Sequence, residues 1–178
     1  MSQLVLPGLL PPPAAPDPLP FGAPSPLIHY PDIPGSVRAN YAKRLGAAGE
    51  RLVDSYLIRW GFHLIEAPES EPYDRMIFVN DDLLRLQIKT VTHAVSGAFR
   101  FSMEQGYRKS PGGRHQYQSN AFDLAALVIL PENVVRFSAE PRRCHRIPAS
   151  EIAYLRRKPQ ASFLDAIAAY RERRALGA

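Results

Sequence analysis

The sequence predicts an α/β fold of the α+β type, in which a mixed sheet is flanked by helices. Three observations predict it. An amphipathic helical pattern covers Ala39–Trp60, two strand patterns at Tyr73–Val79 and Leu83–Val91 are separated by turn residues, and a long apolar run covers Phe122–Leu130. A chain of 178 residues is long enough for one such domain.

The first 36 residues differ in composition from the rest. Eleven of the 18 prolines lie before Gly35, and proline lacks a backbone donor and fixes its own φ angle. We therefore expect residues 1–36 to form a Pro-rich disordered tail, residues 37–150 to form the main domain, and residues 151–178 to form a C-terminal helical extension. Extended proline segments are also a surface that a protein partner could bind.

The predicted helix and hairpin follow from periodicity and turn residues. In the helix, apolar side chains recur three and four residues apart, at Leu45, Leu52, Val53, Tyr56, Leu57 and Trp60. Gly61 indicates its end, and Phe62–Ile65 predicts a short strand. Asn80, Asp81 and Asp82 are typical turn residues, so we expect the strands on either side of them to form an antiparallel hairpin.

The second hairpin strand alternates between apolar and polar residues, with Leu84, Leu86 and Ile88 in one set and Arg85, Gln87 and Lys89 in the other. Successive side chains of a strand point to opposite faces. The apolar set should therefore face the core, while Gln87 and Lys89 project together from the other face.

The second half of the chain gives shorter patterns. Strands are predicted at Phe99–Ser102, Val134–Ser138 and Cys144–Ile147, and a Gly- and Arg-rich loop at Arg108–Gln118. Ser162, with Asp165 three residues later, predicts a capping box that opens a last helix toward Leu176.

Charge and cysteine content restrict the partners. The tail holds two acids and no lysine or arginine, so the formal charge of +5 becomes +7 for the rest, which favours a polyanion such as nucleic acid. The single Cys144 excludes a disulfide framework, and the histidines lack paired ligand spacing, so any metal would be held by oxygen. Without a leader pattern or an apolar stretch of membrane-spanning length, we expect a cytoplasmic protein with no membrane partner.

Four polar residues suit metal-assisted phosphate chemistry. Asp74 and Glu50 can supply carboxylate oxygens, Gln87 an amide oxygen, and Lys89 a positive charge. A divalent cation that assists phosphodiester hydrolysis needs a few oxygen ligands, and the developing phosphorane charge needs a positive group nearby.

In this order the residues resemble the PD-(D/E)xK nuclease superfamily, most of all the endonuclease domain of group I intron homing endonucleases, and they are also similar to archaeal Holliday junction resolvases. The likeness spans residues 39–150. The stretches that carry it are Gly46–Glu50, Tyr73–Asp74, Arg85–Thr90, Phe122–Asp123 and His145–Pro148. It implies a restriction-endonuclease-like core and a DNA endonuclease that depends on Mg²⁺, with Mn²⁺ as a substitute.

The resemblance also implies roles. Asp74 would bind the metal, and Lys89 would orient water or stabilise the transition state. Gln87 stands where the family usually has Glu or Asp; its amide oxygen and the carbonyl of Ile88 can still coordinate Mg²⁺. Glu50 is a further metal-binding and catalytic candidate.

Each of these residues has a plainer interpretation, which for Asp74 is an acid on the surface of a strand, close to a turn. Glu50 could be a solvated helix acid that pairs with Arg51 or Lys43, and Gln87 with Lys89 could be a strand face turned to water. The loop that holds Arg108, Lys109, Arg114 and Tyr117 has two interpretations as well. It could be a solvated flexible loop, or its cations and aromatic ring could serve phosphate contact and base stacking.

Three functions therefore stay open. The first is a DNA endonuclease, acting as a homodimer or higher homo-oligomer where both strands are cut. The second is a nucleic-acid-binding module of the same fold with a weak or inactive site, for which Gln87 is the reason. The third is an interaction protein that recruits a partner through its Pro-rich tail.

Overall fold

The computed structural model describes residues 24–106, 113–118 and 120–177. The chain divides into two units, residues 1–33 and residues 34–178. In the described part of the first unit the backbone forms successive turns, as between Ile28 N–H and Ser25 O. The first 23 residues of the expected disordered tail lie outside the described residues. The second unit contains all the helices and strands described below.

The helical pattern predicted over Ala39–Trp60 corresponds to two helices. α1 covers Gly35–Asn40 and α2 covers Ala42–Arg59, with Tyr41 between them at φ −105° and ψ 17°. Leu45, Val53 and Leu57 are buried, as their spacing predicts. Gly61 follows α2 with φ +86°, a left-handed conformation that glycine adopts readily, and this confirms it as the stop.

The main sheet has five strands in the order β1-β2-β3-β7-β8. Their bounds are β1 Leu64–Glu66, β2 Arg75–Val79, β3 Asp82–Val91, β7 Leu124–Ile129 and β8 Val134–Ser138. β3 and β7 are parallel and the other neighbours are antiparallel. This is the mixed sheet that the sequence predicts, and β2 and β3 form the expected hairpin.

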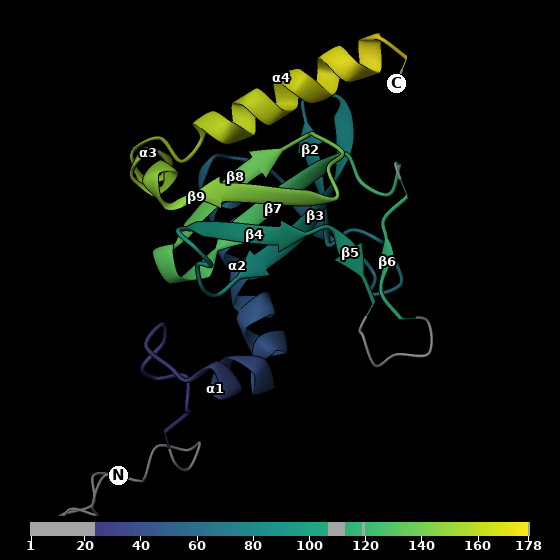
Figure 1. Ribbon diagram of the computed structural model, residues 1–178. Coiled ribbons are helices and arrows are strands. Elements are labelled where there is room, and N and C mark those ends of the chain that lie inside the picture. The colour runs from purple at the N-terminus through teal and green to yellow at the C-terminus, as the bar shows by residue number, and fades with distance from the viewer. Residues whose placement is uncertain (1–23, 107–112, 119, 178) are drawn as a thin grey trace, which may run out of the picture. The chain divides into compact units, whose positions relative to one another are not determined.

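A two-stranded ribbon crosses the sheet. It pairs β4 (Ala98–Ser102) with β9 (Cys144–Pro148), so the last predicted strand does not join the main sheet. Figure 1 shows α2 behind the sheet and this ribbon in front of it. The core between ribbon and sheet is one apolar cluster, formed by Phe99, Phe101, Met103, Ala125, Leu127, Ile129, Val134, Ile147, Ile152 and Leu155.

The chain ends in two helices, α3 (Ile152–Arg157) and α4 (Ala161–Ala175). α4 packs beside β8, where the Phe163 ring lies 5.0 Å from that of Phe137. The helix is the predicted one, but the capping box is wrong: Ser162 Oγ accepts a hydrogen bond from Phe137 N–H, at 3.1 Å, and caps nothing. The hydroxyl instead joins the helix to the sheet. Short 3₁₀ turns at Leu130–Glu132 and Ala149–Glu151 complete the unit.

Two further observations concern the cysteine and the helices of the described residues. Cys144 is a free and exposed thiol. Within residues 24–106, 113–118 and 120–177, no helix combines the length and apolar character needed to cross a membrane.

Candidate functional site

Asp74 lies immediately before β2, next to the middle of β3. Its N–H donates to Leu86 O at 2.9 Å, and its carboxylate oxygen Oδ2 accepts from the N–H of Ile88 at 2.6 Å. These bonds follow from the hairpin register, which places the first residue of β2 opposite Leu86. The structure thus brings Asp74 to the strand segment that carries Gln87 and Lys89.

Gln87 bridges the oxygen atoms that the sequence predicts as metal ligands. Its side-chain nitrogen Nε2 donates to Asp74 Oδ2 at 2.7 Å and to Ile88 O at 3.1 Å. The residue is only 5% exposed, so it is not the solvated strand residue considered above. A half turn of the amide about its last torsion would exchange this donor for the oxygen Oε1, an acceptor and potential ligand.

Lys89 lies beside Gln87 on the same strand and is partly buried. Its ammonium nitrogen Nζ donates to Glu104 O at 2.8 Å and to the Tyr117 hydroxyl at 2.9 Å, and it lies 4.8 Å from the centre of the Tyr117 ring. Burial lowers the pKa of this lysine, and the charges of Asp74 and Glu104 act in the opposite direction. The ammonium therefore sits in an environment where a further negative charge would stabilise it.

The environment of Asp74 disfavours its charge. Burial raises the pKa of this carboxyl group, the Ile88 N–H lowers it, and the charge of Glu50 raises it again; Lys89 and Arg75 lower it less. The net pKa is raised. Two titratable groups with opposite perturbations at neighbouring positions are typical of functional sites, where a cation or a substrate changes the balance.

Glu50 reaches this region because α2 approaches β3 very closely. A Cβ atom added to Gly49 would lie 2.1 Å from Thr90 Oγ1, so only glycine fits there. The neighbouring Glu50 accepts a hydrogen bond through Oε2 from Arg75 Nη2 at 3.2 Å. It is thus a paired acid, but its partner is neither of the cations that the sequence suggested.

Arg75 is the residue of this region that the sequence interpretation missed. It is 2% exposed and donates to Asp54 Oδ1 at 2.8 Å and to the carbonyl of Asp74 at 2.7 Å, besides its bond to Glu50. Burial opposes its charge, but Asp54, Glu50 and Glu66 outweigh that effect and raise its pKa. A signal existed, since Arg75 occupies a core-facing position in the alternation of β2 and Asp54 lies one helical turn after Glu50.

The donor set suits a hard cation held by few protein ligands. In the described part of the chain, no three His, Cys, Asp or Glu side chains come together as a metal-binding group. What converges is one carboxylate of Asp74, the carbonyl of Ile88 and the amide of Gln87, with Glu50 nearby. Mg²⁺ commonly binds through one or two carboxylates and keeps several waters, so these residues fit it.

The predicted DNA-binding loop is described only in part. Arg108 and Lys109 lie outside the described residues. Arg114 is exposed and its Nη1 lies 3.8 Å from Glu104 Oε2, while Tyr117 accepts the bond from Lys89. Pairing of β5 (Glu104–Gln105) with β6 (His115–Gln116) brings these residues to the lysine.

Comparison with known proteins gives a likeness in structure and none in sequence family. No family model matches the sequence, and no curated protein matches it. Among solved structures, the chain is similar to a bacterial homing endonuclease, with 17% sequence identity and a TM-score of 0.47, over 63% of this chain and 72% of that one.

Proposed function

We propose that this chain is a metal-dependent DNA endonuclease. The observation that carries the proposal is the convergence of Asp74 Oδ2, the Ile88 carbonyl and the Gln87 amide at one point of the hairpin, with the Lys89 ammonium on the same strand face. Oxygen ligands beside a positive charge are what phosphodiester hydrolysis requires.

Mg²⁺, with Mn²⁺ as a substitute, is the cofactor that we infer. Asp74, the Ile88 carbonyl and Oε1 of Gln87 would hold the ion, with Glu50 as a further carboxylate. Bound there, the cation would supply Lewis acidity and a water of lowered pKa. Its charge would also relieve the unfavourable burial that raises the pKa of Asp74.

The protein's own residues would position and stabilise the phosphate. Lys89 is held by two neutral oxygens, so its charge is not cancelled by an ion pair within the described residues and can face a phosphate oxygen. Burial, followed by the charge of Asp74, raises the pKa of Tyr117 to about 12. The phenol therefore stays protonated at neutral pH and keeps one O–H donor while it accepts from Lys89.

DNA is the partner that best suits the charge of the domain, which is basic without its tail. A backbone-contacting protein of this kind should bind more weakly as salt rises. One site cuts one strand, so a double-strand break would need a homodimer or higher homo-oligomer.

A cleavage assay tests the proposal. Supercoiled plasmid, linear duplex and four-way junction DNA are incubated with Mg²⁺ or Mn²⁺ and with wild type, Asp74→Ala, Lys89→Ala or Asp81→Ala. Asp81 is an exposed acid in the turn of the same hairpin and serves as the matched control. We expect wild type and Asp81→Ala to cut and the other two not to. The proposal fails if wild type cuts no form, or if both site variants cut as well as the control.

A nucleic-acid-binding module without catalysis is the second candidate. The observation that favours it is that polar groups of the site already have hydrogen-bond partners within the protein. Gln87 Nε2 bonds to Asp74 and Ile88, and Arg75 bonds to Glu50. Gln87→Glu discriminates the two. It adds the carboxylate that the amide lacks, so a gain of cutting supports the nuclease, while salt-sensitive DNA binding without cutting in both proteins supports the module.

A further inference from the structure

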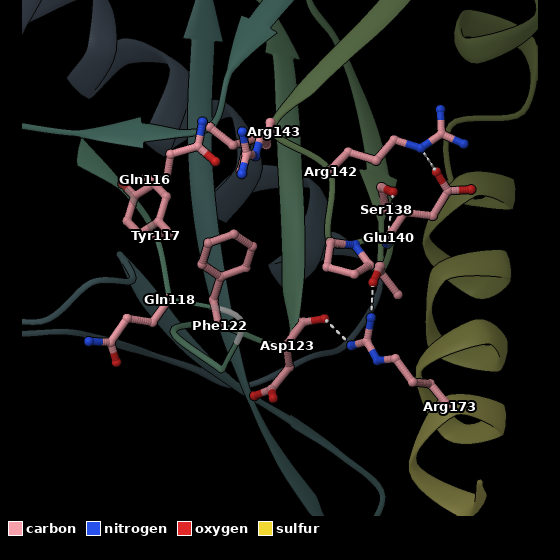
Figure 2. Close-up of a pocket in the computed structure, with 13 residues that line it drawn as sticks. Gln116, Tyr117, Gln118, Phe122, Asp123, Ser138, Glu140, Arg142, Arg143 and Arg173 are labelled. Atoms are coloured by element: carbon pink, nitrogen blue, oxygen red, sulfur yellow. Dashed lines mark hydrogen bonds and ion pairs between the residues drawn. The ribbon is translucent and has the colours of Figure 1, made fainter. Parts of the chain in front are cut away.

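A cavity of about 360 Å³ opens next to the Lys89 site. Its walls come from the segment after β6, the residues before β7, the loop between β8 and β9, and α4. The side chains used below are Tyr117, Phe122, Arg142, Arg143 and Arg173. Figure 2 shows the two rings together on one side, Arg143 above them, Arg142 extending away from them toward Glu140, and Arg173 reaching in from α4.

One part of this cavity is aromatic. The rings of Tyr117 and Phe122 lie 5.2 Å apart, edge to face at 83°, and both side chains are half-buried against the core under the β4–β9 ribbon. Buried support holds the rings in place, so their open surfaces form a preorganised wall for a flat ligand.

The other part carries uncompensated positive charge. The two acids of the lining are already paired, Asp123 with Arg85 and Glu140 with Arg142. Among the described residues Arg143 forms no ion pair, and Arg173 donates only to backbone carbonyls, those of Ala139 and Asp123. The cavity therefore favours a ligand that has an anionic group as well as a flat ring.

We propose that this cavity binds one unpaired nucleotide of a DNA strand, with the base against Tyr117 and Phe122 and the phosphate at Arg143. Its volume falls in the range of small-ligand pockets, and stacking on aromatic rings beside arginine is how proteins hold single nucleotides. This inference rests on the proposed function in one respect, that the ligand is DNA.

The shared residue Tyr117 connects the cavity to Lys89. Its hydroxyl accepts from Lys89 Nζ while its ring lines the cavity. A nucleotide held there would lie one side chain away from the lysine. The strand that is held would then be presented to the site at a distorted point, so the preferred substrate is DNA with an unpaired or easily unstacked nucleotide.

The test measures DNA binding in EDTA, so that no cutting is needed. Anisotropy of a fluorescein-labelled duplex with one unpaired nucleotide is compared with that of the fully paired duplex, for wild type, Arg143→Gln, Phe122→Leu and Arg146→Gln. Arg146 is an exposed arginine three residues along on β9 that is not part of the lining, so it controls for loss of charge.

We expect wild type and Arg146→Gln to bind the duplex with the unpaired nucleotide at least about fivefold tighter, the lower end of base stacking. Arg143→Gln and Phe122→Leu should each bring that ratio close to one. A ratio of one in wild type, or a ratio that survives in both cavity variants, overturns the proposal. An abasic unpaired position that binds as tightly as the natural one also overturns it, because backbone contact would then suffice.

The two proposals can fail separately. A protein that cuts DNA through Asp74 and Lys89 without this binding preference loses only the nucleotide cavity. A protein that shows the preference but cuts no DNA form keeps the cavity and loses the nuclease activity.

Discussion

Two aspartates flank β3 in nearly the same way, but within the described residues only one of them has its carboxylate in an ion pair. Asp74 precedes β2 and Asp123 precedes β7, the two strands that pair with β3. Each donates its N–H to a β3 carbonyl, and each accepts a β3 N–H through Oδ2, from Ile88 at 2.6 Å and from Arg85 at 2.8 Å. The backbone arrangement therefore does not distinguish the two acids.

The neighbouring side chains distinguish the two acids. Arg85 holds Asp123 with a fork, Nε to Oδ2 and Nη2 to Oδ1, both at 3.0 Å. Asp74 receives a neutral amide from Gln87 on Oδ2, its Oδ1 accepts no hydrogen bond within the described residues, and the charge of Glu50 is nearby. Asp123 is thus held by an ion pair with Arg85, whereas Asp74 forms no ion pair within the described residues.

The largest expected effect is on cutting. Asp74→Asn should lower the rate of DNA cleavage by at least about 100-fold, the scale on which loss of one catalytic electrostatic group is measured. Asp123→Asn should retain most of the rate, because Arg85 and not a ligand occupies its oxygens. Initial rates on the best DNA form measure both. Equal losses in the two variants would contradict the distinction.

The next effect tests the contact that brings Glu50 toward Asp74. Gly49→Ala should lower the free energy of unfolding by about 1–3 kcal/mol, since the new methyl group overlaps Thr90. Gly46→Ala, in the same helix, meets nothing within 4 Å and should be neutral or slightly stabilising. Urea denaturation compares them. Gly49→Ala combined with Thr90→Ala should recover part of the loss; strict additivity would show that Thr90 is not the obstacle.

A smaller effect separates the two acids by stability. Asp123→Asn should cost about 1–2 kcal/mol, because one charged hydrogen bond to the half-exposed Arg85 is lost. Asp74→Asn should leave the melting temperature unchanged or raise it, because the ionised carboxylate is disfavoured by burial. Calorimetry at pH 7 measures both variants. A fall of similar size in Asp74→Asn would show that Asp74 is also structural.

The smallest effect is the pH dependence of the stability difference between Asp74→Asn and wild type. The folded-state pKa of Asp74 is raised above its ordinary 3.8, so the folded chain takes up this proton at a higher pH than the unfolded chain. Stability contributed by Asp74 therefore increases as pH falls through the raised pKa. The advantage of Asp74→Asn over wild type should be greatest near neutral pH and shrink toward pH 4 in urea denaturation. A gap that widens on acidification would reverse the sign of the shift.

Local patterns predicted much of the β2–β3 hairpin and its polar face. Alternation along the strand placed Gln87 and Lys89 on one side, and the turn residues set the pairing that brings Asp74 beside them. Alternation could not predict that Gln87 is buried, because residues far along the chain determine what covers a strand face. The break of the first helix at Tyr41 was equally invisible, since neither glycine nor proline stands between Val37 and Leu45.

The remaining site contacts depend on distant segments. Lys89 and Tyr117 are 28 positions apart and meet because β5 and β6 pair, two strands of two residues each that are too short for a sequence pattern. Arg75 meets Glu50 and Asp54 only after α2 packs on the sheet. β9 pairs with β4 and not with an edge of the main sheet, and the alternation of apolar and polar residues in either strand does not predict this.

Tyr117 faces two demands that few side chains can meet together. Its ring is a wall of the cavity and its oxygen is an acceptor for Lys89. Phenylalanine would keep the ring but leave the lysine one acceptor short, and a small polar residue would keep an oxygen but remove the wall. Substitutions aimed at changing which nucleotide is held should therefore start at Phe122, where ring and lysine can be varied independently.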